Sequence, residues 1–127
     1  MSNFTRFNHK PLVNPGYKHY DKDVPFKKAA DLYAIDPERG YTIHAMYRST
    51  SDYGDQIVAC VSTSRPDPLV SFTVDVFRIA FPRKYTEIIN VDDPELIDDC
   101  NNGLAIFRIT QYHSKKFNKE LYDIKFL

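Results

Sequence analysis

The chain has 127 residues, of which 43% are hydrophobic, and its 17 basic and 17 acidic side chains give a formal net charge of zero. This length fits one domain with its own core, and the zero net charge argues against a strongly basic nucleic-acid binder. No apolar run approaches the roughly 20 residues of a membrane helix, and residues 1–10 lack the apolar core of a secretory signal. We therefore expect an intracellular protein that does not bind a membrane.

Charge is nevertheless segregated along the chain. Residues 1–30 carry six Lys or Arg side chains against two acidic ones, whereas residues 86–102 carry six Asp or Glu side chains and no basic one. Residues 103–127 are basic again, with five Lys or Arg against two acidic side chains. We expect a dipolar molecule with one acidic end, whose field steers a polyanion toward another side.

Residues 1–24 are predicted to form an extended arm, because Pro11, Pro15 and Gly16 block regular structure. Aromatic and basic side chains are interleaved in the arm, and together they can stack on bases and neutralise phosphate. The alternatives are that the arm packs across its own domain or docks on a second copy of the chain. Because every predicted element lies in residues 25–127, we expect this single domain to fold without the arm.

A short helix is predicted over residues 25–35, with apolar side chains at helical spacing. Three strand-like runs follow as a β-meander, over residues 41–48, 56–63 and 69–81. Gly54 can supply a positive φ in the first turn. The third run becomes apolar on both faces at Phe77, which predicts a bend or bulge there.

The segment after the meander contains a second helix. Asp93 is its expected N-cap, Pro94 its first residue, and Gly103 lies just past its end. The acidic residues around it are interpreted as a solvated helix face. Two strands close the chain, one beginning at Leu104 and one ending at Phe126.

Two cysteines, Cys60 and Cys100, are too few for a disulfide framework and lack the paired spacing of a zinc site. We expect buried, reduced thiols, with no metal and no other cofactor.

The order of these elements predicts a mainly β (α+β) protein. It is the order of a five-stranded OB-fold-like Greek-key barrel, with a helix between strands three and four and with the arm and short helix in front. OB-folds bind oligonucleotides on strands two and three and with the loops that join strands one to two and four to five. These loops correspond to residues 49–55 and 111–120, which both contain aromatic residues, and the second is the most basic loop of the domain.

Several short motifs resemble one family of proteins. The motifs are Gly40-Tyr41-Thr42-Ile43, Arg48, Tyr53-Gly54, Phe81-Pro82-Arg83-Lys84-Tyr85 and Asn102-Gly103-Leu104. They resemble small OB-fold-like proteins of arthropod DNA viruses and related mobile elements that are suspected of binding single-stranded DNA. The resemblance covers about residues 40–127. It implies a role in replication, repair or recombination, in the nucleus or a viral replication compartment, and it implies that Arg48, Tyr53, Arg83 and Lys84 line or flank the groove.

We therefore predict a protein that binds single-stranded nucleic acid through stacking aromatics and loop cations. The other candidate residues come from the first strand and the second loop: Tyr47, Tyr112, His113, Lys115, Lys116, Phe117 and Lys119. There is no Gly-rich phosphate loop, nucleophile elbow or His-Glu-x-x-His motif, so we expect no catalytic residues and no enzyme. His44 is interpreted as a structural histidine.

The alternative is a non-enzymatic protein-interaction module, or a viral structural or accessory protein, with the same fold. In that case the acidic segment 87–99 would be the recognised surface. An open groove around Tyr47, Tyr53 and Phe117 would favour nucleic acid, whereas an arm that fills this groove would favour the interaction module.

Overall fold

In the computed structural model, residues 13–20, 23–52, 54–63 and 75–127 are described. The elements in chain order are α2 (Ala29–Ile35), β1 (Gly40–Ser51), β2 (Gly54–Ser62), β3 (Val76–Ala80), the 3-10 helix η1 (Arg83–Thr86), α3 (Pro94–Asn101), β4 (Ile106–Ser114) and β5 (Lys119–Phe126). Tyr53 and the first part of the predicted third strand lie outside the described residues.

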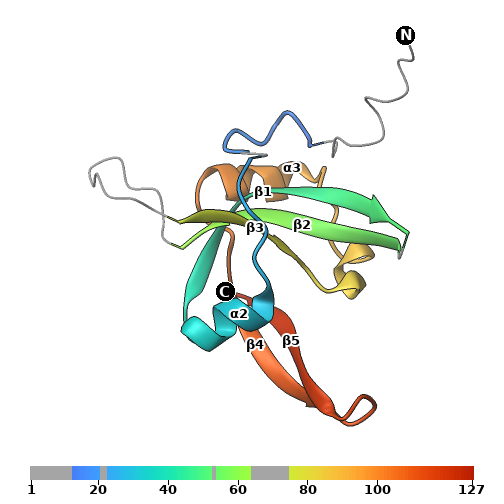
Figure 1. The fold of residues 1–127 in the computed structure, drawn as a ribbon. Coiled ribbons are helices and arrows are strands. Elements are labelled where there is room, and N and C mark those ends of the chain that lie inside the picture. Colours follow the sequence, from blue (N-terminus) through green and yellow to red (C-terminus); the bar gives the residue numbers. More distant parts are fainter. Residues whose placement is uncertain (1–12, 21–22, 53, 64–74) are drawn as a thin grey trace.

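The five strands form one antiparallel sheet in the order β3-β2-β1-β4-β5 (Figure 1). After the η1–α3 connection the chain returns to place β4 beside β1, which is the Greek-key order. The sheet curls into a half-barrel, and among the described residues its two free edges, β3 and β5, are not paired with each other. The predicted mainly β class, with a helix between strands three and four and a short N-terminal helix, is confirmed.

Large apolar side chains fill the inside of the curled sheet. The bulkiest buried ones come from the strands and from the residue after β3: Phe77, Phe81, Phe107, Ile43, Met46, Ile57, Ile79 and Val61. The rings of Phe81 and Phe107 meet edge to face, with 5.2 Å between their centroids. The register of β3 against β2 is regular through Phe77, and the bulge lies instead in β1, between Ile43 and Ala45. Of the bend or bulge that we predicted at Phe77, the bulge is therefore wrong, while the bend stays a prediction.

Both hairpins are longer than predicted. β1 and β2 stay paired up to Ser51 and Gly54, and β4 and β5 stay paired up to Ser114 and Lys119. Most of the residues predicted as the loops 49–55 and 111–120 are therefore strand. Polar cross-strand pairs extend the ladders, since the Thr50 hydroxyl donates to Asp55 at 3.0 Å. Gly54 has a φ of 108°, which confirms the positive φ expected there.

The N-terminal helix begins later than predicted, at Ala29. The residues before it bond to the edge of β3 instead: the Arg78 N–H donates to the Pro25 carbonyl at 2.8 Å, and the Lys27 N–H donates to the Arg78 carbonyl at 2.9 Å. The Arg78 guanidinium also covers the Phe26 ring, 4.2 Å from its centroid. An open strand edge offers unpaired backbone groups, and these contacts satisfy part of that edge.

Helix α3 follows its predicted signals. The Asp93 carboxylate accepts from the Glu95 N–H at 3.0 Å, Pro94 opens the helix, and Gly103 after its end has a φ of 70°. Cys100 of this helix and Cys60 are both buried and form no disulfide, as expected. Burial raises the pKa of the Cys100 thiol to about 12.

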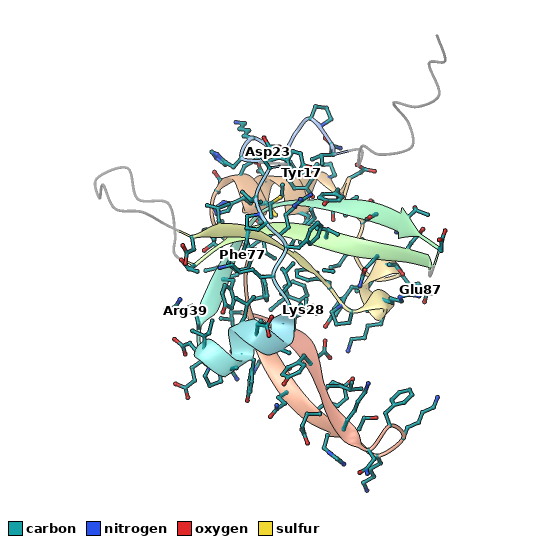
Figure 2. All side chains as sticks on the ribbon, in the orientation of Figure 1. Tyr17, Asp23, Lys28, Arg39, Phe77 and Glu87 are labelled. Atoms are coloured by element: carbon teal, nitrogen blue, oxygen red, sulfur yellow. The ribbon has the colours of Figure 1, made fainter. Side chains whose placement is uncertain are left out.

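Residues 13–20 are part of the folded body. Tyr17 is only 5% exposed, belongs to the core and donates to the Val91 carbonyl at 2.7 Å. The Asn101 side chain, at the end of α3, donates to the Gly16 carbonyl at 2.8 Å. Figure 2 shows Tyr17 between the N-terminal segment and α3. Because Tyr17 is a core residue, its position argues against our expectation that the domain folds without residues 13–20, and a stability measurement is needed to decide it.

Candidate nucleic-acid interface

The β4–β5 hairpin extends away from the rest of the sheet (Figure 1). Its four-residue turn runs from Lys115 to Asn118, between the last strand pair, Ser114 and Lys119. Asn118 has a φ of 50°, a left-handed conformation that asparagine tolerates better than most residues. The Ser114 hydroxyl accepts from the Phe117 N–H at 3.3 Å. The conformation of the turn is therefore set by local features, the left-handed Asn118 and the hydrogen bond to Ser114.

Phe117 at this turn is an exposed apolar ring close to two cations. It is 59% exposed, and the Nζ atoms of Lys116 and Lys119 lie 5.3 Å and 5.9 Å from the centroid of its ring. Such contacts are cation–π interactions. A base that stacks on this ring would bring its phosphates close to both ammonium groups, which is the combination that single-strand binding uses.

Farther along the hairpin the candidate residues differ in what they can contact. Tyr112 is 49% exposed, so its ring is accessible. His113 is paired across the strands with Glu120, with 2.9 Å between Nδ1 and Oε1. The neighbouring carboxylate makes His113 a weaker candidate for a phosphate contact. Lys115 is exposed, and within the described part of the chain no ion pair involves it.

A second group of predicted cations gathers around η1. Arg48 of β1 pairs with Asp55 at 3.3 Å and donates to the Thr86 carbonyl at 2.7 Å, which ties β1 to η1. A Cβ at Gly54 would lie 3.5 Å from the Arg83 guanidinium, so Arg83 lies beside the β1–β2 hairpin. The fold thus brings Arg48 and Arg83 together, although they are far apart in the sequence.

Lys84 connects this group to the β4–β5 hairpin. Its ammonium donates to Asp123 of β5 at 2.5 Å, and this hydrogen bond is the main cause that raises the pKa of Lys84. Tyr112 is also close enough to influence that pKa. For Asp123, partial burial acts to raise the pKa, but the hydrogen bonds from Lys84, from the Ile124 N–H and from Tyr85 outweigh it and lower the pKa overall.

The structure does not place Tyr47 at this surface, so that prediction was wrong. Tyr47 is 2% exposed, and its hydroxyl accepts from the Arg78 guanidinium at 3.2 Å. The Tyr20 ring packs against it edge to face, with 5.8 Å between the centroids. A base cannot stack on a buried ring. The N-terminal segment therefore covers the face of β1 that carries Tyr47, while Tyr53 lies outside the described residues.

One pair of side chains that resembles a reactive group, His44 with Ser62, is buried. The His44 Nε2 and Ser62 Oγ atoms lie 2.7 Å apart. However, both residues are buried, and the His44 ring also contacts the His19 ring, with 6.2 Å between the centroids. Burial is the main cause that lowers the pKa of His44, and His19 adds to it. The interpretation of His44 as a structural histidine agrees with this position.

The acidic residues of α3 lie away from the tip of the β4–β5 hairpin. Glu95, Asp98 and Asp99 of α3 are exposed, and Figure 1 shows α3 and the tip of the β4–β5 hairpin at opposite ends of the molecule. These three acidic side chains therefore lie far from the hairpin tip, whereas Glu87, at the end of η1, lies beside the η1 cations.

Sequence reasoning missed one functional candidate, Asp123, which fixes Lys84. Alternation along β5 marks Asp123 only as a polar strand residue, and its partner lies 39 positions earlier. No local signal connects the two. Only a prediction of how β5 curls toward η1 could have found the pair.

Comparison with protein-family models, with curated protein sequences and with solved structures finds no match. Within the described residues, no helix is long and apolar enough to cross a membrane.

Proposed function

We propose that this protein binds single-stranded nucleic acid along a surface that begins at the η1 cations and follows the β4–β5 hairpin to its tip. The observation that carries the proposal is Phe117, an exposed ring with the ammonium groups of both Lys116 and Lys119 within 6 Å of its centroid. The ring supplies sequence-tolerant stacking, and the lysines supply the salt-dependent contacts with phosphate.

The η1 cations extend this surface. Arg48, Arg83 and Lys84 come from separate parts of the chain and lie around one short helix. Arg48 and Lys84 each keep a carboxylate partner, so they neutralise phosphate less fully than an unpaired cation would. The main electrostatic contribution is therefore assigned to Lys115, Lys116 and Lys119.

The proposed role is non-catalytic and belongs to replication, repair or recombination. The resemblance to OB-fold-like proteins of arthropod viruses and mobile elements suggests that the strand is DNA. It also suggests that the protein acts in the nucleus or in a viral replication compartment. The resemblance itself stays a prediction.

The test is a fluorescence-anisotropy titration with oligo-dT at several salt concentrations. Replacing Lys115, Lys116 and Lys119 with alanine should lower affinity and flatten the salt dependence. The magnitude of the slope of log affinity against log salt should decrease by about 2, because each of the three phosphate contacts on a single strand contributes about 0.7.

A matched control removes three cations elsewhere. Lys18, Lys28 and Arg39 are exposed and lie outside the hairpin, so replacing them with alanine makes the same change in net charge. If both triple variants lose the same affinity and slope, only the net charge matters and the hairpin is not the binding surface. If the wild-type protein binds no oligonucleotide, the proposed function is wrong.

A protein-interaction module is the second candidate, and the covered face of β1 favours it. Tyr20 packs on Tyr47 where an open groove was expected. In that case a partner protein or a second copy of the chain would cover Phe117 and Tyr112, and oligonucleotides would not bind.

A further inference from the structure

The two faces of the β4–β5 hairpin differ in charge. The two strands pair in a regular register, so residues that oppose each other share a face, and the faces alternate along each strand. One set of alternate residues, which we call the outer face, consists of Arg108, Thr110, Tyr112 and Ser114 of β4 and of Lys119, Leu121, Asp123 and Lys125 of β5. Three of these eight residues are cationic and one is acidic.

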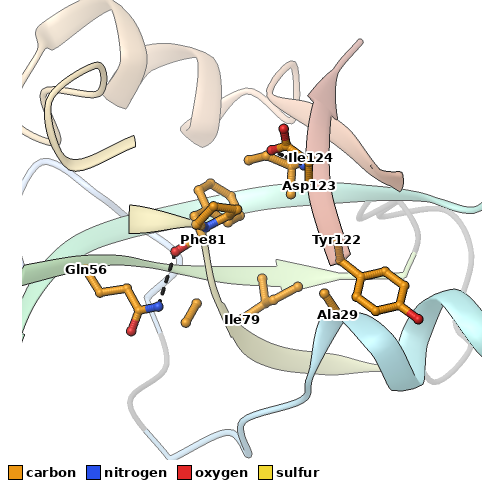
Figure 3. A pocket seen from close by; sticks show the side chains of 9 residues that line it. Ala29, Gln56, Ile79, Phe81, Tyr122, Asp123 and Ile124 are labelled. Atoms are coloured by element: carbon orange, nitrogen blue, oxygen red, sulfur yellow. Dashed lines mark hydrogen bonds between the residues drawn. The ribbon is translucent and has the colours of Figure 1, made fainter. Parts of the chain in front are cut away.

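The opposite face of the hairpin, which we call the inner face, has no lysine or arginine among its strand residues. Ile124 on this face is buried in the core, and the Tyr122 ring packs on Tyr33 of α2, with 5.6 Å between the centroids. Figure 3 shows Tyr122 beside α2, at a cavity of about 200 Å³. Nearer the tip, the inner face carries Glu120 and His113, which are paired with each other. A polyanion is therefore attracted to the outer face.

Two cations of the outer face are available for phosphate. Within the described residues, no ion pair involves Arg108 or Lys125. The Nε atom of Arg108 is buried and has no hydrogen-bond partner among these residues. A guanidinium suits phosphate because its planar set of donors matches the phosphate oxygens. The acid of this face, Asp123, is bonded to Lys84, so its negative charge is balanced.

An accessible aromatic ring lies on the same face as these cations. Tyr112 is 49% exposed and lies between Arg108 and the hairpin tip. Residues 108–114 of the strand span about 20 Å, at about 3.4 Å for each residue, so a ligand that reaches from the tip to Arg108 must be extended. The N-terminal segment covers the face of β1 that carries Tyr47. The outer face of the hairpin, in contrast, offers an exposed ring to a base.

We propose that the bound single strand continues from the hairpin tip along the outer face, with one base stacked on Tyr112 and with phosphates on Arg108 and Lys125. Aromatic stacking combined with cations along the backbone is the arrangement that single-strand binding uses. This inference rests on the proposed single-strand binding. It commits the strand to one face of the hairpin and adds two phosphate contacts to those of the tip.

The test is a fluorescence-anisotropy titration of the full chain with oligo-dT at several salt concentrations. In the double variant Arg108→Gln, Lys125→Gln, the magnitude of the slope of log affinity against log salt should decrease by about 1.4, because each of the two lost contacts contributes about 0.7. Tyr112→Ala should weaken binding about 5- to 100-fold, the loss expected for one stacked base.

The matched control is the double variant Lys28→Gln, Arg39→Gln, which also removes one lysine and one arginine. Both residues are exposed and flank α2, so this control should keep the slope of the wild type. In addition, NMR of the wild-type protein with oligo-dT should shift the ring signals of Tyr112 and the methyl signals of Leu121. The ring signals of Tyr122 on the inner face should stay in place, and this result does not depend on any variant folding.

An unchanged slope in Arg108→Gln, Lys125→Gln, with unshifted Tyr112 and Leu121 signals, would overturn this inference and leave binding at the hairpin tip intact. An equal loss of slope in both double variants would show an effect of net charge alone and would also overturn it. Shifts of Tyr122 in place of Tyr112 would put the strand on the inner face, with the same consequence. If the protein binds no oligo-dT, both this inference and the proposed function are wrong.

Discussion

The position of Tyr17 predicts that the N-terminal segment stabilises the fold. Tyr17→Ala removes a buried aromatic side chain and its hydrogen bond to the Val91 carbonyl. Removal of a buried aromatic ring typically costs about 3–5 kcal/mol. At about 4 °C for each kcal/mol in a domain of this size, the Tm should fall by about 12–20 °C.

Two further variants divide this effect into its parts. Tyr17→Phe keeps the ring and loses only the hydrogen bond, which should cost about 1–2 kcal/mol. Tyr112→Ala removes a tyrosine that is largely exposed on β4, so the free energy of unfolding should change by less than about 1 kcal/mol.

Thermal unfolding followed by circular dichroism on the full chain measures all three variants. We expect the loss of Tm to be largest for Tyr17→Ala, smaller for Tyr17→Phe and smallest for Tyr112→Ala. If Tyr17→Ala melts within a few degrees of wild type, the segment is not part of the cooperative unit, and our original expectation of a dispensable arm would be restored.

Three other predictions follow from the site. Phe117→Ala should weaken binding of oligo-dT by about 1–3 kcal/mol without a change in Tm, and a lowered Tm would mean that the ring packs on protein instead. Burial lowers the pKa of His44 below 6.5. As the pH drops below 6.5, the histidine of the unfolded chain is therefore protonated before that of the folded chain, and the stability of the fold should decrease. The Tm of His44→Gln should depend less on pH between pH 5 and 7 than the Tm of the wild type. Because the pKa of Asp123 is lowered in the folded protein, this carboxylate stabilises the fold above pH 3.8, and the stabilisation is lost as the pH falls through the folded pKa. In a carboxyl NMR titration, Lys84→Gln should raise the pKa of Asp123. An unchanged pKa would show that Lys84 does not hold the carboxylate.

Elements whose signals lie close together in the sequence were predictable. Asp93, Pro94 and Gly103 mark both ends of α3 within a few residues, and the structure uses each as expected. The start of α2 was not predictable in this way. Pro25 and Lys27 bond to Arg78, about fifty residues later, and the edge of β3 becomes available to them only in the folded sheet.

The candidate site shows the same division. The aromatic and basic composition of the turn after Ser114 identified Phe117 and its lysines directly. Alternation along β1 separates two faces but does not show that both are covered, and every residue from Tyr41 to Tyr47 is buried. We therefore predicted an open groove at Tyr47, whereas in the structure the Tyr20 ring packs on Tyr47.

The covered face of β1 and the exposed hairpin together restrict where a strand can bind. Stacking on Tyr47 would first require displacement of Tyr20 from its ring contact, which would cost stability. Phe117 requires no such step, because its ring is already exposed and the Ser114 hydroxyl and the left-handed Asn118 shape the turn that carries it. A group that is fixed before binding loses less conformational entropy when its ligand arrives. The hairpin tip can therefore contribute more of its stacking energy to affinity than the sheet face can, and the acidic residues of α3 at the far end favour approach of a polyanion from the hairpin side.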